Sequence, residues 1–372
     1  MSVLDAIGNT PLVEIQNLWD SAKTGVRIMA KLEGSNPGGS VKDRPAYFML
    51  KEAVAAGKLG PGKTILEPTS GNTGIGMAVV AAAMGFKIKL TMPTCVSEER
   101  RSVLQALGAE LELTPGCDRT DGAIRRAHHI MEREGDKYFM PNQFDNPHNT
   151  LAHYHTTGPE ILEQTAGEID LFVAGMGTTG TLMGCSRFLK EKKPSVQIIG
   201  VEPTLNHRIQ GLKNMQEAIV PKIYDRGRLD GIISCADDDA FNTIRDLSLR
   251  EGLFCGISSG AAMWGAIQAA RDLPRGSTVV VIFPDRGDRY HPRWGSVRFV
   301  IFYLLFRFFL PNIYIYYSAK GDQLNGRKAS DGKNCLGHWI EQGNWKGNRG
   351  ASRPLRSQCD CPRIDLGLST GF

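Results

Sequence analysis

The chain has 372 residues, long enough for about two domains with a sizeable core. Its net charge of +5 comes from residues 295–372, because residues 1–294 are close to neutral. A neutral body gives no support to nucleic-acid binding. The eight cysteines are scattered without zinc-site spacing, and no apolar secretory leader opens the chain. We therefore expect a cytoplasmic protein with reduced thiols and no metal.

Residues 1–294 alternate short β-rich apolar runs with segments of helical period, a pattern typical of parallel sheets covered by helices on both faces. The expected strands are 26–32, 64–67, 87–92, 110–114, 171–174, 197–202 and 278–283. The expected helices are 44–56, 74–84, 97–107, 120–134, 181–191, 238–251 and 259–272. Segment 145–157 is interpreted as a crossover, so the sequence predicts two α/β domains, 1–150 and 151–294.

Residues 295–372 break this pattern, and we expect them to lie outside the fold. An apolar and aromatic run over 297–317 is near the length of a membrane span, but Arg307, Pro311 and Asn312 interrupt it. The other interpretation is that this tail is not a selected sequence, for example the product of a shifted reading frame, because no periodicity or turn chemistry organises it. We do not expect a membrane protein.

The segment 36–44, Asn-Pro-Gly-Gly-Ser-Val-Lys-Asp-Arg, places Lys42 just behind a glycine turn where a helix can begin. The positive end of the helix dipole would disfavour the ammonium form there, so the segment favours a nucleophilic or imine-forming amine. The same residues also fit an ordinary surface lysine after a turn.

The segment 67–74 joins an expected strand to an expected helix. Free N–H groups at the helix start, with the hydroxyls of Thr69, Ser70 and Thr73, could bind a carboxylate. Asn72 could also donate its side-chain amide. An ordinary helix cap explains the same residue types equally well.

The segment 175–181, Gly-Met-Gly-Thr-Thr-Gly-Thr, follows an expected strand and precedes an expected helix. Its glycines allow a close backbone approach, and its amides and hydroxyls suit a phosphate dianion. It has neither the Lys-Ser/Thr pair of a Walker loop nor the acidic partner of a dinucleotide fingerprint. A phosphate without a nucleotide, together with a buried lysine, points to pyridoxal 5′-phosphate (PLP).

The three motifs Asn-Pro-x-x-Ser-x-Lys-Asp-Arg, Thr-Ser-Gly-Asn-Thr-Gly and Gly-x-Gly-Thr-x-Gly-Thr, in this order and spacing, resemble the cysteine synthase (O-acetylserine sulfhydrylase) family of fold-type II PLP enzymes. The likeness runs over residues 7–290, and 176–181, 254–256 and 285–288 look more like the B-type isozyme than the A-type. The resemblance implies a tryptophan synthase β-like fold of two three-layer α/β domains with twisted, mostly parallel sheets. It also implies that a segment near 11–33 packs on the second domain, and that the enzyme is a homodimer.

The resemblance further implies a role for each motif residue. Lys42 would be the catalytic lysine that holds PLP as a Schiff base, and Asn72 would meet the phenolic oxygen of the cofactor. The phosphate would be held by Gly177, Thr178, Thr179, Gly180 and Thr181. Ser258 would meet the pyridine nitrogen, and a hydroxyl cannot hold a positive charge there, which favours β-elimination over racemisation or transamination. The substrate contacts would be Thr69, Ser70, Gly71, Thr73 and Gln143.

The implied activity is formation of L-cysteine from O-acetyl-L-serine and sulfide, or of S-sulfocysteine from thiosulfate. B-type members carry an arginine near the site where this chain has Lys213, so the affinity for a divalent oxyanion is open. O-phosphoserine sulfhydrylase and cystathionine β-synthase-like activities are alternatives, because fold alone does not fix chemistry. A catalytically impaired relative that acts only as a binding partner is an alternative of another class. Family members can also bind the C-terminal peptide of serine acetyltransferase.

Overall fold

The computed structural model describes residues 2–69 and 71–293, and Met1–Arg293 form one compact unit. The apolar run over 297–317 and the rest of the tail lie outside the described residues. Within the described part of the chain, no helix is both long enough and apolar enough to cross a bilayer.

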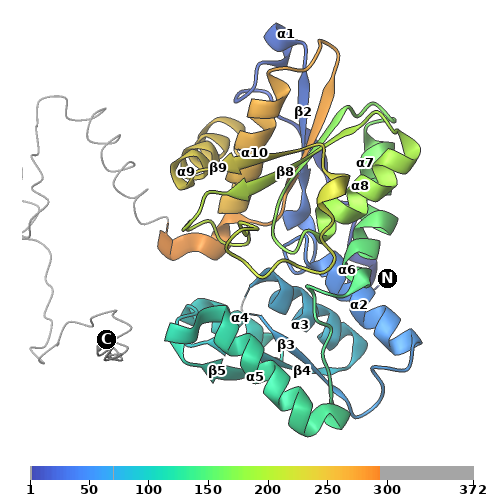
Figure 1. The fold of residues 1–372 in the computed structure, drawn as a ribbon, viewed down its shortest axis with the longest axis vertical. Helices are drawn as coiled ribbons and strands as arrows, with labels where there is room; N and C mark the ends of the chain where they lie inside the picture. Colours follow the sequence, from blue (N-terminus) through green and yellow to red (C-terminus); the bar gives the residue numbers. More distant parts are fainter. Residues whose placement is uncertain (1, 70, 294–372) are drawn as a thin grey trace, which may run out of the picture. The chain divides into compact units, whose positions relative to one another are not determined.

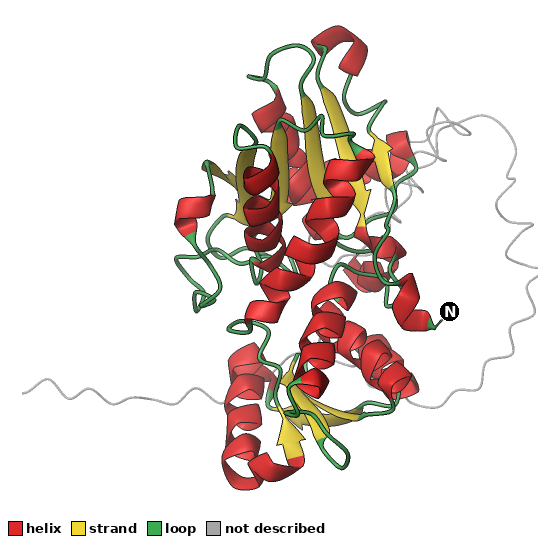
Figure 2. Cartoon of the chain, turned by 90° about the vertical axis from the view of Figure 1, so that its right-hand side faces the viewer, coloured by secondary structure: helices red, strands yellow, loops and turns green. Residues whose placement is uncertain are grey.

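The larger sheet has six strands in the order β1-β2-β10-β7-β8-β9, and only β1 runs antiparallel to its neighbour. Its strands are β1 (Leu12–Glu14), β2 (Arg27–Leu32), β7 (Leu171–Gly175), β8 (Gln197–Pro203), β9 (Gly231–Cys235) and β10 (Thr278–Phe283). The early strands β1 and β2 therefore join strands that come more than a hundred residues later. Figures 1 and 2 show helices on both faces of this sheet.

The smaller sheet has four parallel strands in the order β5-β4-β3-β6. Its strands are β3 (Thr64–Pro68), β4 (Lys87–Pro93), β5 (Glu110–Thr114) and β6 (Tyr138–Phe139). The two sheets and their helices confirm the predicted α/β class with mostly parallel sheets.

The α-helices alternate with the strands up to β6, and later α6 is followed by α7 and α9 by α10 without a strand between them. They are α1 (Ser21–Thr24), α2 (Asp43–Ala55), α3 (Asn72–Met84), α4 (Glu98–Ala106), α5 (Arg119–Glu134), α6 (Pro147–Ala152), α7 (Gly158–Gln164), α8 (Gly180–Lys192), α9 (Asp237–Asp246) and α10 (Ile257–Ala270). Two π-helices continue α6 and α9, η5 (His153–Thr157) and η7 (Leu247–Glu251). Short 3-10 turns are η1 (Val3–Ala6), η2 (Glu33–Ser35), η3 (Gly116–Asp118), η4 (Gly135–Lys137), η6 (Arg226–Arg228) and η8 (Gly287–Arg293).

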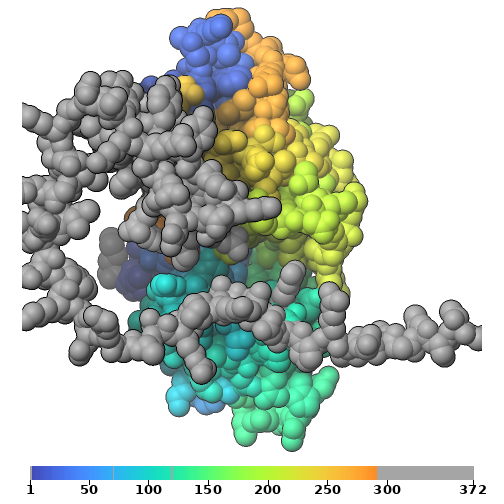
Figure 3. All heavy atoms as spheres, turned by 90° about the vertical axis from the view of Figure 1, so that its left-hand side faces the viewer, coloured from blue at the N-terminus to red at the C-terminus, as the bar shows by residue number. Residues whose placement is uncertain are grey.

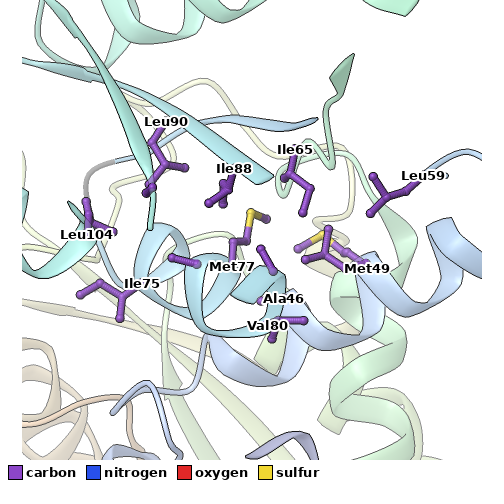
Figure 4. Close-up of a cluster of buried hydrophobic side chains, with 14 of the residues drawn as sticks. Ala46, Met49, Leu59, Ile65, Ile75, Met77, Val80, Ile88, Leu90 and Leu104 are labelled. Carbon is purple, nitrogen blue, oxygen red and sulfur yellow. The ribbon is translucent and has the colours of Figure 1, made fainter. Parts of the chain in front are cut away.

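The core of the smaller sheet lies between one sheet face and helices α2, α3 and α4. Figure 4 shows Ile65, Ile88 and Leu90 from the strands meeting Met77 of α3 and Met49 of α2. All five are essentially inaccessible to solvent. Burying a side chain of this size contributes about 1.5–3 kcal/mol, so this contact fixes α2 and α3, and with them the loops that precede both helices.

Two segments that lie far apart in the sequence, around α1 and just before β10, meet at one end of the larger sheet. Figure 3 shows the residues around α1 beside those that precede β10, and Arg275 donates a hydrogen bond to the carbonyl oxygen of Lys23 at 2.9 Å. Since β2 and β10 are adjacent parallel strands, this contact closes the N-terminal segment onto the larger sheet.

Candidate active site

Lys42 occupies the N-cap position of α2. The turn ahead of it uses Gly39 at a φ of 76°, a left-handed conformation that favours glycine. The N–H of Val41 donates to the carbonyl oxygen of Pro284 at 2.8 Å, so the loop is anchored to the end of β10. Burial lowers the pKa of the Lys42 amine, and the negative charges of Asp285 and Glu33 oppose that effect. The lowered pKa of Lys42 therefore comes mainly from burial, and not from the helix dipole expected from the sequence.

The loop before α3 brings the second motif to the same place. Gly71 is the N-cap residue of α3, and the Thr73 hydroxyl donates to Oε1 of Gln143 at 2.6 Å. The amide of Asn72 donates through Nδ2 to Oδ2 of Asp285 at 2.6 Å. Ser70, predicted as a substrate contact, lies outside the described residues.

The loop between β7 and α8 carries the predicted phosphate site. Thr179 adopts a left-handed φ of 68° directly before the first turn of α8, where free N–H groups accumulate. The Thr179 hydroxyl oxygen is buried and has no hydrogen-bond partner among the described residues. A Cβ on Gly177 would lie 2.5 Å from the carbonyl oxygen of Gly211, so only glycine allows this close approach. A helix N-terminus with an unpaired buried hydroxyl fits a phosphate group.

Ser258 lies in the first turn of α10, which begins after Gly256. Only 4% of Ser258 is exposed. A helix start again holds a hydroxyl at a fixed position, as the predicted role beside a ring nitrogen requires.

These loops line one cavity of roughly 250 Å³. The predicted site residues on its wall are Lys42, Thr69, Gly71, Asn72, Thr73, Gln143, Gly177, Thr178, Thr179, Thr181, Lys213 and Ser258. Gly180 is buried in the same loop as its neighbours, at the first position of α8. Lys42 and the predicted phosphate loop thus line the same cavity, which fits a phosphorylated aldehyde held as an imine.

The structure also brings residues to the cavity that the sequence analysis did not assign. Phe144 and Tyr290 line it, and Lys213 lies with its ammonium 4.1 Å from the centre of the Phe144 ring. Burial lowers the pKa of Lys213. Asp285, which accepts a hydrogen bond from Asn72, was also not assigned to the site. Its place just after the carboxyl end of β10 could have indicated a site residue, because parallel sheets bind ligands at that edge.

His153 contacts the predicted phosphate loop at Thr181. It lies in the π-helix η5, within the segment 145–157 that was interpreted as a crossover, and it is buried. Its ring nitrogens lie 2.9 Å from the Thr157 hydroxyl and 3.3 Å from the Thr181 hydroxyl. Burial holds the pKa of His153 well below its ordinary value, with the charges of Arg44 and Lys42 acting in the same direction. A neutral ring can accept a hydrogen bond from Thr181.

Glu67 holds the Gln143 loop. Its carboxylate accepts hydrogen bonds from the N–H groups of Asn142 at 3.0 Å and Gln143 at 3.2 Å. Burial raises the pKa of Glu67 to about 7, although these two bonds favour the ionised form.

Comparison with known proteins agrees with this geometry. The family described as pyridoxal-phosphate dependent enzyme matches residues 3–285. Cysteine synthase B of Salmonella typhimurium is 47% identical over 284 residues, which cover 76% of this chain and 92% of that protein. A cysteine synthase structure from Entamoeba histolytica superposes with a TM-score of 0.75 at 39% identity, over 78% of this chain and 89% of that one.

A solved O-acetylserine dependent cystathionine β-synthase from Helicobacter pylori is also similar. Its TM-score is 0.72 at 38% identity, over 78% of this chain and 96% of that one. The matched family segment contains every described residue that was predicted for the site. The chain belongs to the cysteine synthase family of pyridoxal-phosphate dependent enzymes, of PLP fold type II.

Proposed function

We propose that this enzyme forms L-cysteine from O-acetyl-L-serine and sulfide by PLP-dependent β-replacement. The observation that carries the proposal is the single cavity that holds the Lys42 amine together with the β7–α8 phosphate loop and the hydroxyl of Ser258. When bound, PLP supplies an electron sink for the negative charge that develops at the α-carbon of the amino acid.

The residues of the chain hold the reactants and move one proton. Thr69, Gly71, Thr73 and Gln143 would bind the substrate carboxylate through hydroxyl, backbone and amide donors. Lys42 would take the α-proton and later return it, since burial lowers the pKa of its amine and makes the neutral form accessible. Ser258 would offer a neutral hydroxyl to the ring nitrogen of PLP, where other PLP enzymes use a carboxylate. The cofactor would then stabilise less of the negative charge from the α-carbon, which favours loss of the β-substituent.

Substitution of the lysine tests the assignment. Lys42→Ala should lose turnover by about 10²–10⁴-fold, the range expected for a general base, and should lose the visible absorbance of lysine-bound PLP. Lys190→Ala is a matched control, because Lys190 lies in a surface ion pair with Asp230 and should leave both properties unchanged. Unaltered turnover and absorbance in Lys42→Ala would refute the role of Lys42.

We expect Lys213 to influence which leaving group and which sulfur donor the enzyme accepts. A cation on the cavity wall, packed against Phe144, favours an anionic group and gives O-phosphoserine and thiosulfate specific support as substrates. Turnover should be compared for O-acetylserine and O-phosphoserine, each with sulfide and with thiosulfate. If Lys213 recognises a dianion, Lys213→Met should lose activity with O-phosphoserine or thiosulfate while keeping activity with O-acetylserine and sulfide.

The similarity to a cystathionine β-synthase suggests a third candidate activity, in which homocysteine replaces sulfide as the nucleophile. An assay with that thiol tests it. A purified protein that is colourless and inert with every donor would instead support a binding role. We further propose that the enzyme is a cytoplasmic homodimer that can bind the C-terminal peptide of serine acetyltransferase. The support is the family resemblance, and analytical ultracentrifugation with and without the peptide tests it.

A further inference from the structure

The end of strand β10 connects three of the loops that line the active-site cavity, those of Lys42, Asn72 and Ser258. The carbonyl oxygen of Pro284 accepts from Val41, and Asp285 forms an antiparallel bridge with Ser40. The carbonyl oxygen of Asp285 accepts from the N–H of Gly256 at 3.1 Å, just before the helix that carries Ser258. Asp285 is therefore tied through its backbone to the Lys42 loop on one side and to the Ser258 loop on the other.

The side chain of Asp285 contacts the loop of Asn72. Its Oδ2 atom accepts from Nδ2 of Asn72 at 2.6 Å and from the hydroxyl of Tyr290 at 2.6 Å. The carboxylate also packs against Gly256 so closely that a Cβ at that position would collide with its Oδ1 atom. Asp285 is only 2% exposed, so the carboxylate is fixed by packing as well as by hydrogen bonds.

The other end of the Asn72 amide is also fixed. Arg289 donates to Oδ1 of Asn72 and, through its second terminal nitrogen, to the carbonyl oxygen of Gly38. A guanidinium can only donate, so the atom of Asn72 that Arg289 contacts is the amide oxygen, and the amide nitrogen faces Oδ2 of Asp285. An amide held in this way cannot turn over without losing both bonds.

We propose that Asp285 is a positioning residue that, together with Arg289, fixes the Asn72 amide so that its second N–H donates into the cavity. The inference rests on the proposed contact between Asn72 and the phenolic oxygen of PLP. That oxygen accepts hydrogen bonds, and an amide turned the other way would present a second acceptor to it. Asp285 thus acts through Asn72 and needs no contact with the substrate.

A double-mutant cycle on cofactor affinity tests this. The dissociation constant of PLP and the absorbance maximum of the bound cofactor are measured for the wild type, Asp285→Ala, Asn72→Ala and the double variant. Each single change should weaken binding on the order of tenfold, as expected for one charge-assisted hydrogen bond. The double variant should be no weaker than Asn72→Ala, and both single variants should shift the absorbance maximum in the same direction.

Additive losses in the double variant, with an unshifted absorbance maximum in Asp285→Ala, would overturn the proposal and leave the role of Asn72 intact. An unchanged affinity and spectrum in Asn72→Ala would instead refute the role of Asn72 itself. Asp288→Ala is the matched control on the same segment, because Asp288 pairs with Arg286 at the surface and should change neither readout.

Two further variants keep the test decisive if Asp285→Ala does not fold. Asp285→Asn can place its oxygen at the Oδ2 position, so it should keep both hydrogen bonds and restore the wild-type spectrum. Arg289→Leu removes the donor to Oδ1 of Asn72, so it should weaken PLP binding and shift the absorbance maximum as Asn72→Ala does. A wild-type affinity and spectrum in Arg289→Leu would contradict the proposed fixing of the amide.

Discussion

Asp43, the residue after Lys42, is a buried carboxyl in the first turn of α2. Its Oδ2 atom accepts from the N–H of Gly38, and Oδ1 has no hydrogen-bond partner among the described residues. Burial raises the pKa of Asp43 to about 7, even though the Gly38 bond and the charge of Arg289 favour the ionised form. The residue next to Lys42 thus changes its charge near neutral pH.

This raised pKa predicts a pH-dependent stability. Between about pH 4 and pH 7 the folded state keeps a proton on Asp43 that the unfolded chain has released, so this group makes the free energy of unfolding fall as pH rises. Asp43→Asn cannot ionise and should lack that part of the decline. Urea unfolding of both proteins across pH 4–8 measures the difference, and parallel pH profiles would show that Asp43 has an ordinary pKa.

Site residues could be predicted from the sequence where all residues of a motif lie within one short segment of the chain. Lys42, Asn72 and Thr179 each lie in a loop whose short motif carries its own chemistry, and all three line the cavity. Asp285 and Tyr290 were assigned no role, because their contacts join segments far apart in the chain. The bond from Asn72 to Asp285 spans 213 positions, and no short pattern encodes such a contact.

At the scale of elements, a buried ion network ties the two sheets together. Arg44 on α2 pairs with Glu33 at 2.7 Å and with Glu160 on α7 at 2.6 Å, and Lys31 on β2 also pairs with Glu160 at 2.7 Å. The Thr10 hydroxyl donates to Glu33 at 2.7 Å. Because α2 packs on the smaller sheet while β2 belongs to the larger one, the network fixes the helix whose N-cap residue is Lys42.

Arg44→Leu should destabilise the protein by about 3–5 kcal/mol, because it leaves the buried carboxylate of Glu33 without its charged partner. Arg187→Leu is the matched control, since the pair between Arg187 and Glu191 lies on the surface and contributes little. Urea unfolding measures both. Equal and small losses in the two variants would mean that the network does not stabilise the fold.

Strongly periodic elements were predicted well from the sequence. The predicted strands at 110–114 and 278–283 coincide with β5 and β10. The strands β1, β6 and β9 were missed. The three residues of β1 and the two of β6 are too few to show a period. Segment 145–157, interpreted as a crossover, contains α6 and the π-helix η5, and the π-helix η7 completes the predicted helix 238–251. Local propensity does not distinguish an α-turn from a π-turn.

At the scale of the molecule, one ligand site is built from both sheets. Asn72 follows β3 of the smaller sheet, whereas Thr179 and Ser258 belong to connections of the larger one. PLP should therefore stabilise the whole unit of residues 1–293, by about 2.7 kcal/mol at a free concentration one hundred times its dissociation constant. Calorimetry with and without PLP should show a single transition that moves as one, and two transitions of which only one responds would contradict this coupling.

The lysine that carries the cofactor can be identified chemically. The PLP-loaded enzyme is reduced with borohydride, digested with trypsin, and mapped by mass spectrometry. We predict that the cofactor mass lies at Lys42 on peptide 32–51, because the modified Lys42 and the Arg44–Pro45 bond both resist trypsin. A label on Lys31, Lys213 or any other lysine, or no labelled peptide at all, would contradict the proposed active site.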